Sequence, residues 1–224
     1  SNTVTGLSVP SLEALLMHKI PFSAQTKRIP LFGLGCMAGV SGINRASEYL
    51  KVYPSKAVLF FSVELCSLTV QFDDFSIENL ISTALFGDGM ASVLLVGEDH
   101  PLKKNAPLQW IGSNQLLIPN SKDVMGWEFR NSGQKVILDS HVPKITEKYL
   151  SSFIETSLQN LKLSTADITH FMSHPGGPKV LEAVEKAMGF NSDELHYSWN
   201  CLKEKGNMSS VSVLKIINDH LNNP

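Results

Sequence analysis

A single cysteine stands at a turn between an apolar run and a helical pattern, and this arrangement constrains the fold most strongly. The apolar run Arg28–Leu34 predicts a short strand that leads into Gly35 and Cys36. Apolar residues then recur at helical spacing: Val40, Ile43, Ala46 and Leu50. A helix N-terminus offers free N–H groups and the positive end of a dipole, which favour a thiolate over a thiol. The pattern therefore predicts that Cys36 is a nucleophile with a lowered pKa.

Two further stretches place a polar side chain just before a helical pattern. His174–Pro178 reads His-Pro-Gly-Gly-Pro, and Gly206–Ser210 reads Gly-Asn-Met-Ser-Ser. We predict that Cys36, His174 and Asn207 meet in space, with His174 as a second source of thiolate stabilisation. Taken one at a time, the three residues have simpler interpretations: an inert buried thiol, a turn histidine and a turn asparagine.

Composition excludes several classes of protein. The chain has 224 residues, of which 43% are hydrophobic and 18% charged, which indicates a globular protein with a real core. The net charge of −2 means that the chain has no excess of positive charge with which to bind nucleic acid or an anionic membrane. No apolar run is long enough to span a bilayer, and no signal peptide is visible. The three cysteines form no C-x-x-C pair, which argues against a zinc site or disulfides and favours the cytoplasm: Cys36, Cys66 and Cys201.

Strand-like and helix-like segments alternate along the chain. Ala57–Val63 and Ala91–Val96 predict strands buried on both faces, and Ile168–Met172 predicts a short strand that leads into His174. Thr3–Thr5 resembles the end of a strand, so we expect the chain to be truncated at its N-terminus. Helical spacing is present in several segments: 11–16, 77–84, 145–161, 180–188 and 211–221. The alternation predicts a layered α/β fold with helices on the sheet.

Four motifs in a fixed order resemble the type III polyketide synthases, the chalcone synthase family, in its bacterial form. The motifs are Gly33–Cys36, Leu85–Gly89, His174–Pro178 and Gly206–Ser210, and the resemblance covers essentially the whole chain. It implies a thiolase-like fold of αβαβα layers with mixed sheets, incomplete here because the family extends beyond both ends. By this resemblance, residues 1–100 are the remainder of a first half carrying the nucleophile. Residues 101–224 are a truncated second half carrying the histidine and the asparagine.

The resemblance also implies a reaction. A starter acyl-CoA acylates Cys36, malonyl-CoA loses carbon dioxide, and the resulting enolate attacks the thioester; the extended chain cyclises to a pyrone or an aromatic ring. His174 and Asn207 would donate hydrogen bonds to the developing enolate, a role for which asparagine suits better than aspartate. No cofactor is implied beyond coenzyme A thioesters as substrates, no metal is implied, and the family works as a homodimer.

Further residues match family positions that line the substrate cavity. Phe86 resembles a phenylalanine that gates the malonyl entrance, Thr69 a threonine of the elongation cavity, and Ser209 a serine beside the catalytic trio. Val136 replaces a second gating phenylalanine and would leave more room, which predicts a long or bulky aliphatic starter. Thr69 and Val136 also fit plain packing roles, and Phe86 fits a core position equally well.

The remaining matches lie near the N-terminus and after the histidine. Val4 and Thr5 match the other wall of the cavity, and Val9 matches a residue that reaches into the partner's cavity across the dimer. Lys179 matches a position near a coenzyme A phosphate. Two glycines would allow close backbone approach to a ligand and a proline would start the next helix: Gly176, Gly177 and Pro178.

Two other functions remain open on the sequence. An initiating ketoacyl synthase also uses cysteine, histidine and asparagine, but its histidine motif is His-Gln-x-Asn and its carrier protein binds a basic patch, neither of which is present here. A catalytically silent chain that survives as a folding or interaction module is the second alternative, because the family extends beyond both ends of this sequence.

Overall fold

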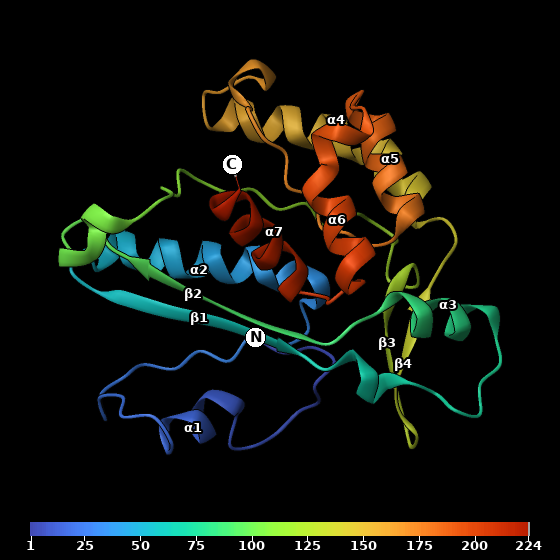
Figure 1. Cartoon of the computed structure of the whole chain (residues 1–224), viewed down its shortest axis with the longest axis horizontal. Coiled ribbons are helices and arrows are strands. Elements are labelled where there is room, and N and C mark those ends of the chain that lie inside the picture. The colour runs from blue at the N-terminus through green and yellow to red at the C-terminus, as the bar shows by residue number, and fades with distance from the viewer. Residues whose placement is uncertain (224) are drawn as a thin grey trace.

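The computed structural model describes residues 1–223, so the predicted second half, 101–224, is described except for its last residue. Figure 1 shows the arrangement. The strands are β1 (Ala57–Glu64), β2 (Gly89–Val96), β3 (Met125–Arg130) and β4 (Gly133–Leu138). The helices are α1 (Leu12–Met17), α2 (Ala38–Val52), α3 (Ile77–Leu85), α4 (Val142–Asn160), α5 (Pro178–Met188), α6 (His196–Lys205) and α7 (Val211–Asn222).

Strands β1 and β2 form an antiparallel pair that runs from Ala57 opposite Val96 to Glu64 opposite Gly89. Helices α2 and α7 pack on one face of this pair, and Phe60 of β1 joins the α7 side chains in one core cluster (Figure 1). The prediction of two strands was correct, but the prediction that both faces are buried was wrong. Side chains alternate between buried and exposed along both strands, because within residues 1–223 these helices cover one face only.

Helix α2 confirms the predicted helix and most of its predicted buried face. Ala46 and Leu50 are buried and Ile43 packs on the core, whereas Val40 is 45% exposed. The rest of the buried side consists mainly of small residues. A Cβ on Gly39 would overlap the backbone carbonyl oxygen of Ser210, and one on Gly42 would overlap the Phe60 ring. The small residues therefore allow α2 to lie directly against the start of α7 and against β1, which brings the N-terminal end of α2 next to the 206–210 segment.

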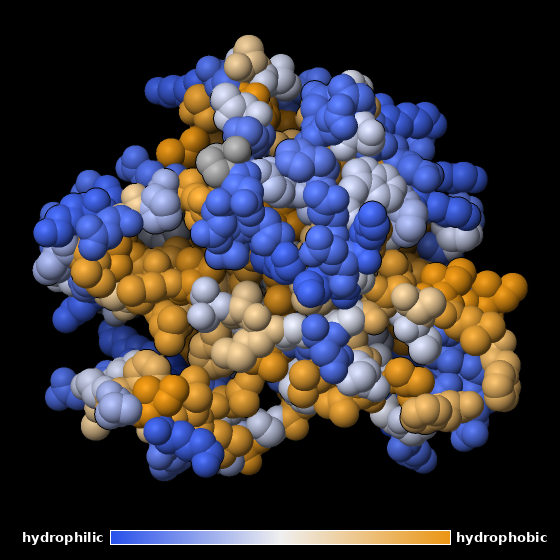
Figure 2. Space-filling model, viewed as in Figure 1, coloured by the Kyte–Doolittle hydropathy of each residue, from blue (hydrophilic) through white to orange (hydrophobic). Residues whose placement is uncertain are grey.

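Helix α3 also forms where the spacing predicted it, yet its apolar side faces outward. Ile77 is 70% exposed, Leu80 55% and Ile81 51%, whereas Asn79 and Ser82 are buried. Figure 2 shows broad hydrophobic areas on the side of the molecule where Figure 1 places α3. The helical period was therefore read correctly, while the buried side is fixed by polar contacts of the neighbouring loop.

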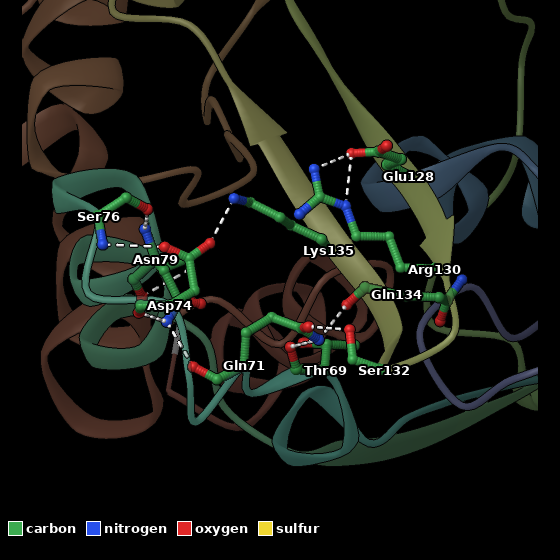
Figure 3. A network of polar contacts seen from close by, with 11 residues as sticks. Thr69, Gln71, Asp74, Ser76, Asn79, Glu128, Arg130, Ser132, Gln134 and Lys135 are labelled. Carbon is green, nitrogen blue, oxygen red and sulfur yellow. Dashed lines mark hydrogen bonds and ion pairs between the residues drawn. The ribbon is translucent and has the colours of Figure 1, made fainter.

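A network of amide side chains fastens the β3–β4 hairpin to the loop before α3 (Figure 3). Gln71 Nε2 donates to the backbone oxygen of Gln134 at 3.2 Å, and Gln134 Nε2 donates to the backbone oxygen of Thr3 at 3.1 Å. Asn79 Nδ2 of α3 donates to the backbone oxygen of Gln71 at 2.9 Å. Three segments distant in sequence are joined in this way, and β4 comes to lie beside the turn Cys66–Thr69.

An ion pair at the edge of the network joins the same segments. Lys135 of β4 pairs with Asp74 (Figure 3). The contact with Lys135, helped by the Ser76 backbone N–H, lowers the pKa of the Asp74 carboxyl below its usual range. The pair is accessible to water, so its role is to orient the hairpin more than to stabilise it.

Three predicted strand segments are extended or bent but form no strand: Thr3–Thr5, Arg28–Leu34 and Ile168–Met172. A strand requires a hydrogen-bonded neighbour, and among residues 1–223 the two pairs β1–β2 and β3–β4 include none of them. The start of the chain still follows β1, because the Ser1 ammonium group donates to the Phe61 backbone oxygen at 2.5 Å. In residues 1–223, no helix combines the length and the apolar character needed to cross a membrane.

Candidate active site

Cys36 lies in a short 3-10 turn, Gly35–Met37, that leads directly into α2. Gly33 and Gly35 have φ angles of +81° and +56°, a left-handed conformation that glycine adopts at no steric cost. The glycines therefore let the chain turn sharply enough to present the thiol at the start of the helix. This position agrees with the prediction from the sequence.

Ser209 and Asn207 lie close enough to the Cys36 thiol for their side chains to lower its pKa. Cys36 and Asn207 are thereby brought together, as predicted, from segments that are far apart in the sequence. Ser209, predicted to lie beside the catalytic residues, does so.

The predicted lowering of the Cys36 pKa is wrong. Burial of the thiol raises its pKa to about 11; Ser209 and Asn207 lower it, and the charge of Glu64 raises it further. Burial also lowers the pKa of His174 to about 4, so the imidazole is neutral and supplies no positive charge. In this conformation the thiol is protonated at neutral pH, because desolvation outweighs the end of the helix dipole.

Asn207 is fully buried and has a fixed orientation. Its Oδ1 accepts the backbone N–H of Ser209 at 2.8 Å, and Ser209 adopts the left-handed conformation, with φ of +50°, that makes this contact. Asn207 Nδ2 has no hydrogen-bond partner among the described residues. Since buried donors are nearly always paired, the free Nδ2 is a donor available to a ligand.

The backbone of Asn207 is joined to the end of α3. Asn207 N–H donates to the Leu85 oxygen at 2.8 Å, and Gly87 N–H donates to the Asn207 oxygen at 3.0 Å. Gly206, with φ of +69°, allows this approach, because a Cβ there would overlap the Leu85 oxygen. Asn207 and Phe86 are thus parallel neighbours in an isolated bridge.

His174 lies in a loop that reaches the same turn from another direction. Ser198 of α6 donates its hydroxyl to the Ser173 oxygen at 2.7 Å, and a Cβ on Gly177 would lie 3.4 Å from the Leu85 side chain. Both ring nitrogens of His174 are enclosed and have no hydrogen-bond partner among the described residues. Contact between His174 and the Cys36 thiol stays a prediction.

A pocket of about 210 Å³ opens beside this cluster, lined in part by Cys66, Thr69 and Phe86. The predicted placement of Thr69 and Phe86 at a cavity agrees with this geometry. Cys66 is close enough to Cys36 to be affected by its charge, although burial is the main cause that raises the pKa of Cys66 to about 12. The pocket therefore lies on the side of the thiol where the β1–β2 ladder ends.

Two family profiles match this sequence. The profile described as "Chalcone and stilbene synthases, C-terminal domain" matches residues 109–223. The chain belongs to the chalcone and stilbene synthase family. A second profile, described as "FAE1/Type III polyketide synthase-like protein", matches residues 2–109 of this chalcone and stilbene synthase chain.

Individual relatives agree with this assignment. The chain is 48% identical over 223 residues to the "Putative chalcone synthase" of Bacillus subtilis (strain 168), covering 98% of the chain and 61% of the relative. It is 38% identical to the 1,3,6,8-tetrahydroxynaphthalene synthase of Streptomyces peucetius subsp. caesius, covering 97% and 57%. The crystal structure of 1,3,6,8-tetrahydroxynaphthalene synthase from Streptomyces coelicolor A3(2) superposes with a TM-score of 0.87 at 28% identity, covering 100% and 62%. The chain thus spans about three fifths of the relatives' length, and the predicted thiolase-like fold is confirmed.

In this chalcone and stilbene synthase chain, Trp127 supports the Phe86 side of the pocket without lining the pocket itself. Its ring centroid lies 5.8 Å from that of Phe86, and in the β3–β4 hairpin it stands opposite Val136. Val136 is buried, and β4 contacts the turn Cys66–Thr69. The sequence did not reveal this role of Trp127; its position opposite Val136 in a hairpin was the signal that could have shown it.

Glu64 is a second residue whose role near the site the sequence did not reveal. The side chain is fully buried, and its Oε2 accepts the backbone N–H groups of Thr3 and Val4 at 2.9 and 3.0 Å. Its Oε1 accepts the hydroxyl of Ser210. A carboxylate at the end of a buried strand was the available signal, since such a group needs several donors.

The other residues predicted to bind substrate do not line this pocket, and their predicted roles stay predictions. Val4 is buried at its contact with Glu64, and the Thr5 hydroxyl donates to the Val63 oxygen at 2.7 Å, so both hold the start of the chain to β1. Val9 is fully exposed, and Lys179 is exposed on α5. Pro178 occupies the first helical position of α5, as predicted, and follows Gly176 and Gly177.

Proposed function

We propose that this chain carries the active site of a type III polyketide synthase, which condenses an acyl-CoA starter with malonyl-CoA. The single observation that supports the proposal most directly is the fully buried Asn207, whose side chain lies close enough to the Cys36 thiol to lower its pKa and whose Nδ2 has no partner among the described residues. Family membership and relatives named as 1,3,6,8-tetrahydroxynaphthalene synthases agree with this function. Cys36, His174 and Asn207 are the proposed catalytic residues.

In the proposed loading step, Cys36 sulfur attacks the carbonyl carbon of the starter thioester. A bond forms between sulfur and the acyl carbon, the bond to coenzyme A breaks, and the released thiolate takes up a proton. Because the pKa of Cys36 is raised to about 11, the thiol proton must leave as the attack proceeds. His174, held neutral by a pKa lowered to about 4, is an acceptor for that proton.

In the proposed extension step, the carbon–carbon bond to the malonyl carboxylate breaks and carbon dioxide leaves. The electron pair moves onto the thioester oxygen, which becomes an enolate. Asn207 Nδ2 and a ring N–H of His174 donate hydrogen bonds to this oxygen, and both are already buried and free to do so. The enolate carbon then attacks the acyl group on Cys36, and the sulfur leaves as a thiolate.

The pocket beside the thiol would receive the growing chain. Phe86 lies on one side of it, and the turn Cys66–Thr69 on the other. The Phe86 ring is backed by a second aromatic ring, that of Trp127, with the two centroids 5.8 Å apart. We therefore propose a narrow aliphatic chain over a bulky aromatic starter. A cytoplasmic homodimer is part of the same proposal.

The raised pKa of Cys36 favours a second candidate, a catalytically silent chain. Two measurements distinguish the synthase from the silent chain: release of carbon dioxide from labelled malonyl-CoA, and product masses from a panel of acyl-CoA starters. Asp73→Asn, at an exposed site away from the thiol, serves as the matched control for Cys36→Ala. Loss of the polyketide product in Cys36→Ala and of carbon dioxide release in Asn207→Asp, with both kept in the control, supports the synthase; no carbon dioxide release from the unmodified protein refutes it.

A further inference from the structure

The last pair of the β1–β2 ladder, Glu64 opposite Gly89, marks the point where two segments separate around the pocket. One continues as the turn Cys66–Thr69, and the other arrives from α3 as Phe86–Asp88. Both line the pocket of about 210 Å³. The width of the pocket therefore depends on what holds these two segments at their separation.

One carboxylate joins the two segments. The backbone N–H of Ser67 donates to Asp88 Oδ1 at 2.8 Å, and the Ser67 hydroxyl donates to Asp88 Oδ2 at 2.7 Å. Within residues 1–223, these are the only hydrogen bonds between the turn Cys66–Thr69 and Phe86–Asp88. Because both carboxylate oxygens are engaged, the contact fixes the orientation of the turn as well as its distance.

The two segments are not held equally on their other sides. Phe86–Asp88 is fixed by the hydrogen bond from Gly87 N–H to the Asn207 oxygen, at 3.0 Å. The turn Cys66–Thr69 has no side-chain cap at its start, and Leu68 at its centre is exposed. Loss of the contact between Ser67 and Asp88 would therefore move the turn, and with it one wall of the pocket, while the other wall stays in place.

We propose that Asp88 is a positioning residue that holds the turn Cys66–Thr69 at a fixed distance from Phe86 through Ser67, and so limits the length of acyl chain that the pocket accepts. Asp88 itself touches neither the thiol nor the free donor of Asn207. Loosening the contact thus widens the pocket and lengthens the product, while decarboxylation continues. The part of this inference that concerns products rests on the proposed function.

The first test does not depend on activity. Alkylation by iodoacetamide is followed at Cys66 and Cys201 separately, by peptide mass mapping, in the unmodified protein and in Ser67→Ala. Cys66 lines the pocket, whereas Cys201 lies in the core between α6 and α7 and reports general loosening. We expect Cys66 to react about tenfold faster in Ser67→Ala, the change expected for easier local opening, with Cys201 unchanged. Ser67→Thr keeps the hydroxyl and should restore the original rate.

Two outcomes of the labelling overturn the proposal: an unchanged rate at Cys66 in Ser67→Ala, or an equal rise at Cys201. The second test compares product masses from the unmodified protein, Ser67→Ala and the control Asp73→Asn. Longer products from Ser67→Ala alone, with carbon dioxide release kept, support the proposal, and identical products overturn it. If the unmodified protein forms no polyketide, the proposed function fails, and the labelling result alone decides whether Asp88 holds the turn.

Discussion

Replacing Asn207 with aspartate tests the proposed chemistry at its centre. The free Nδ2 donor becomes a carboxyl oxygen, while the other oxygen can still accept the Ser209 N–H, so the backbone is expected to stay in place. Loss of one preorganised donor to an oxyanion typically lowers the rate by about 10²–10³, or roughly 2.7–4 kcal/mol in the barrier. Since Asn207 is fully buried, water is poorly placed to replace the donor, and we expect the full effect.

A second effect of Asn207→Asp acts on the thiol. A carboxylate in contact with Cys36 would raise the pKa of that thiol further, in the same direction as Glu64 already does. The assay is release of labelled carbon dioxide from malonyl-CoA, with thermal unfolding measured on the same sample. A variant that unfolds at the same temperature as the unmodified protein and decarboxylates within about threefold of its rate would refute the assignment of Asn207 as the oxyanion donor.

Five further outcomes follow from the structure. Glu64→Gln removes the charge that accepts two backbone N–H groups, so the free energy of unfolding in denaturant should fall by about 1–3 kcal/mol. Gly39→Ala places a Cβ against the backbone of α7, and the overlap should cost about 1–3 kcal/mol in the same measurement. Alkylation of Cys36 should keep accelerating as pH rises toward about 11, and should not level off near 9; a plateau near 9 would contradict the buried thiol. Because this pKa lies above its ordinary value of 9.0, the associated stability is present below pH 9 and is lost between about 9 and 11, so thermal unfolding should shift downward there. Trp127→Ala removes the ring that packs against Phe86 and should yield products of higher mass from the same starter; an unchanged mass spectrum would contradict a role of Trp127 in holding Phe86 at the pocket.

The positions of the catalytic candidates could be predicted because local chemistry determines them. The glycines with left-handed backbone around Cys36 and at Gly206 can be recognised in the sequence as turn residues. Helices α2 and α7 follow from the spacing of apolar residues. The charge state of Cys36 could not be predicted, since its pKa depends on burial by segments far along the chain. The same applies to the buried Glu64, whose donors come from Thr3 and Val4.

Other errors came from contacts that a local pattern does not contain. Helix α2 buries its small residues because it must approach Ser210 closely, and no apolar period indicates this. Helix α3 turns Asn79 inward because the backbone of Gln71 accepts its amide. Ile168–Met172 has the composition of a strand, but a strand also requires a neighbour. For the two helices, periodicity predicted the element and tertiary contacts decided which face is buried; for Ile168–Met172, the missing neighbour decided that no strand forms.

Two backbone hydrogen bonds join the end of α3 to Asn207, so Phe86 and Asn207 are expected to move together. Phe86 lines the pocket, while Asn207 carries a free Nδ2 donor. In the proposed synthase, an oversized chain that displaces the Phe86 ring would therefore also displace this donor. Size selection and rate then vary together, so a substitution chosen to broaden substrate range at this turn should be expected to slow turnover as well.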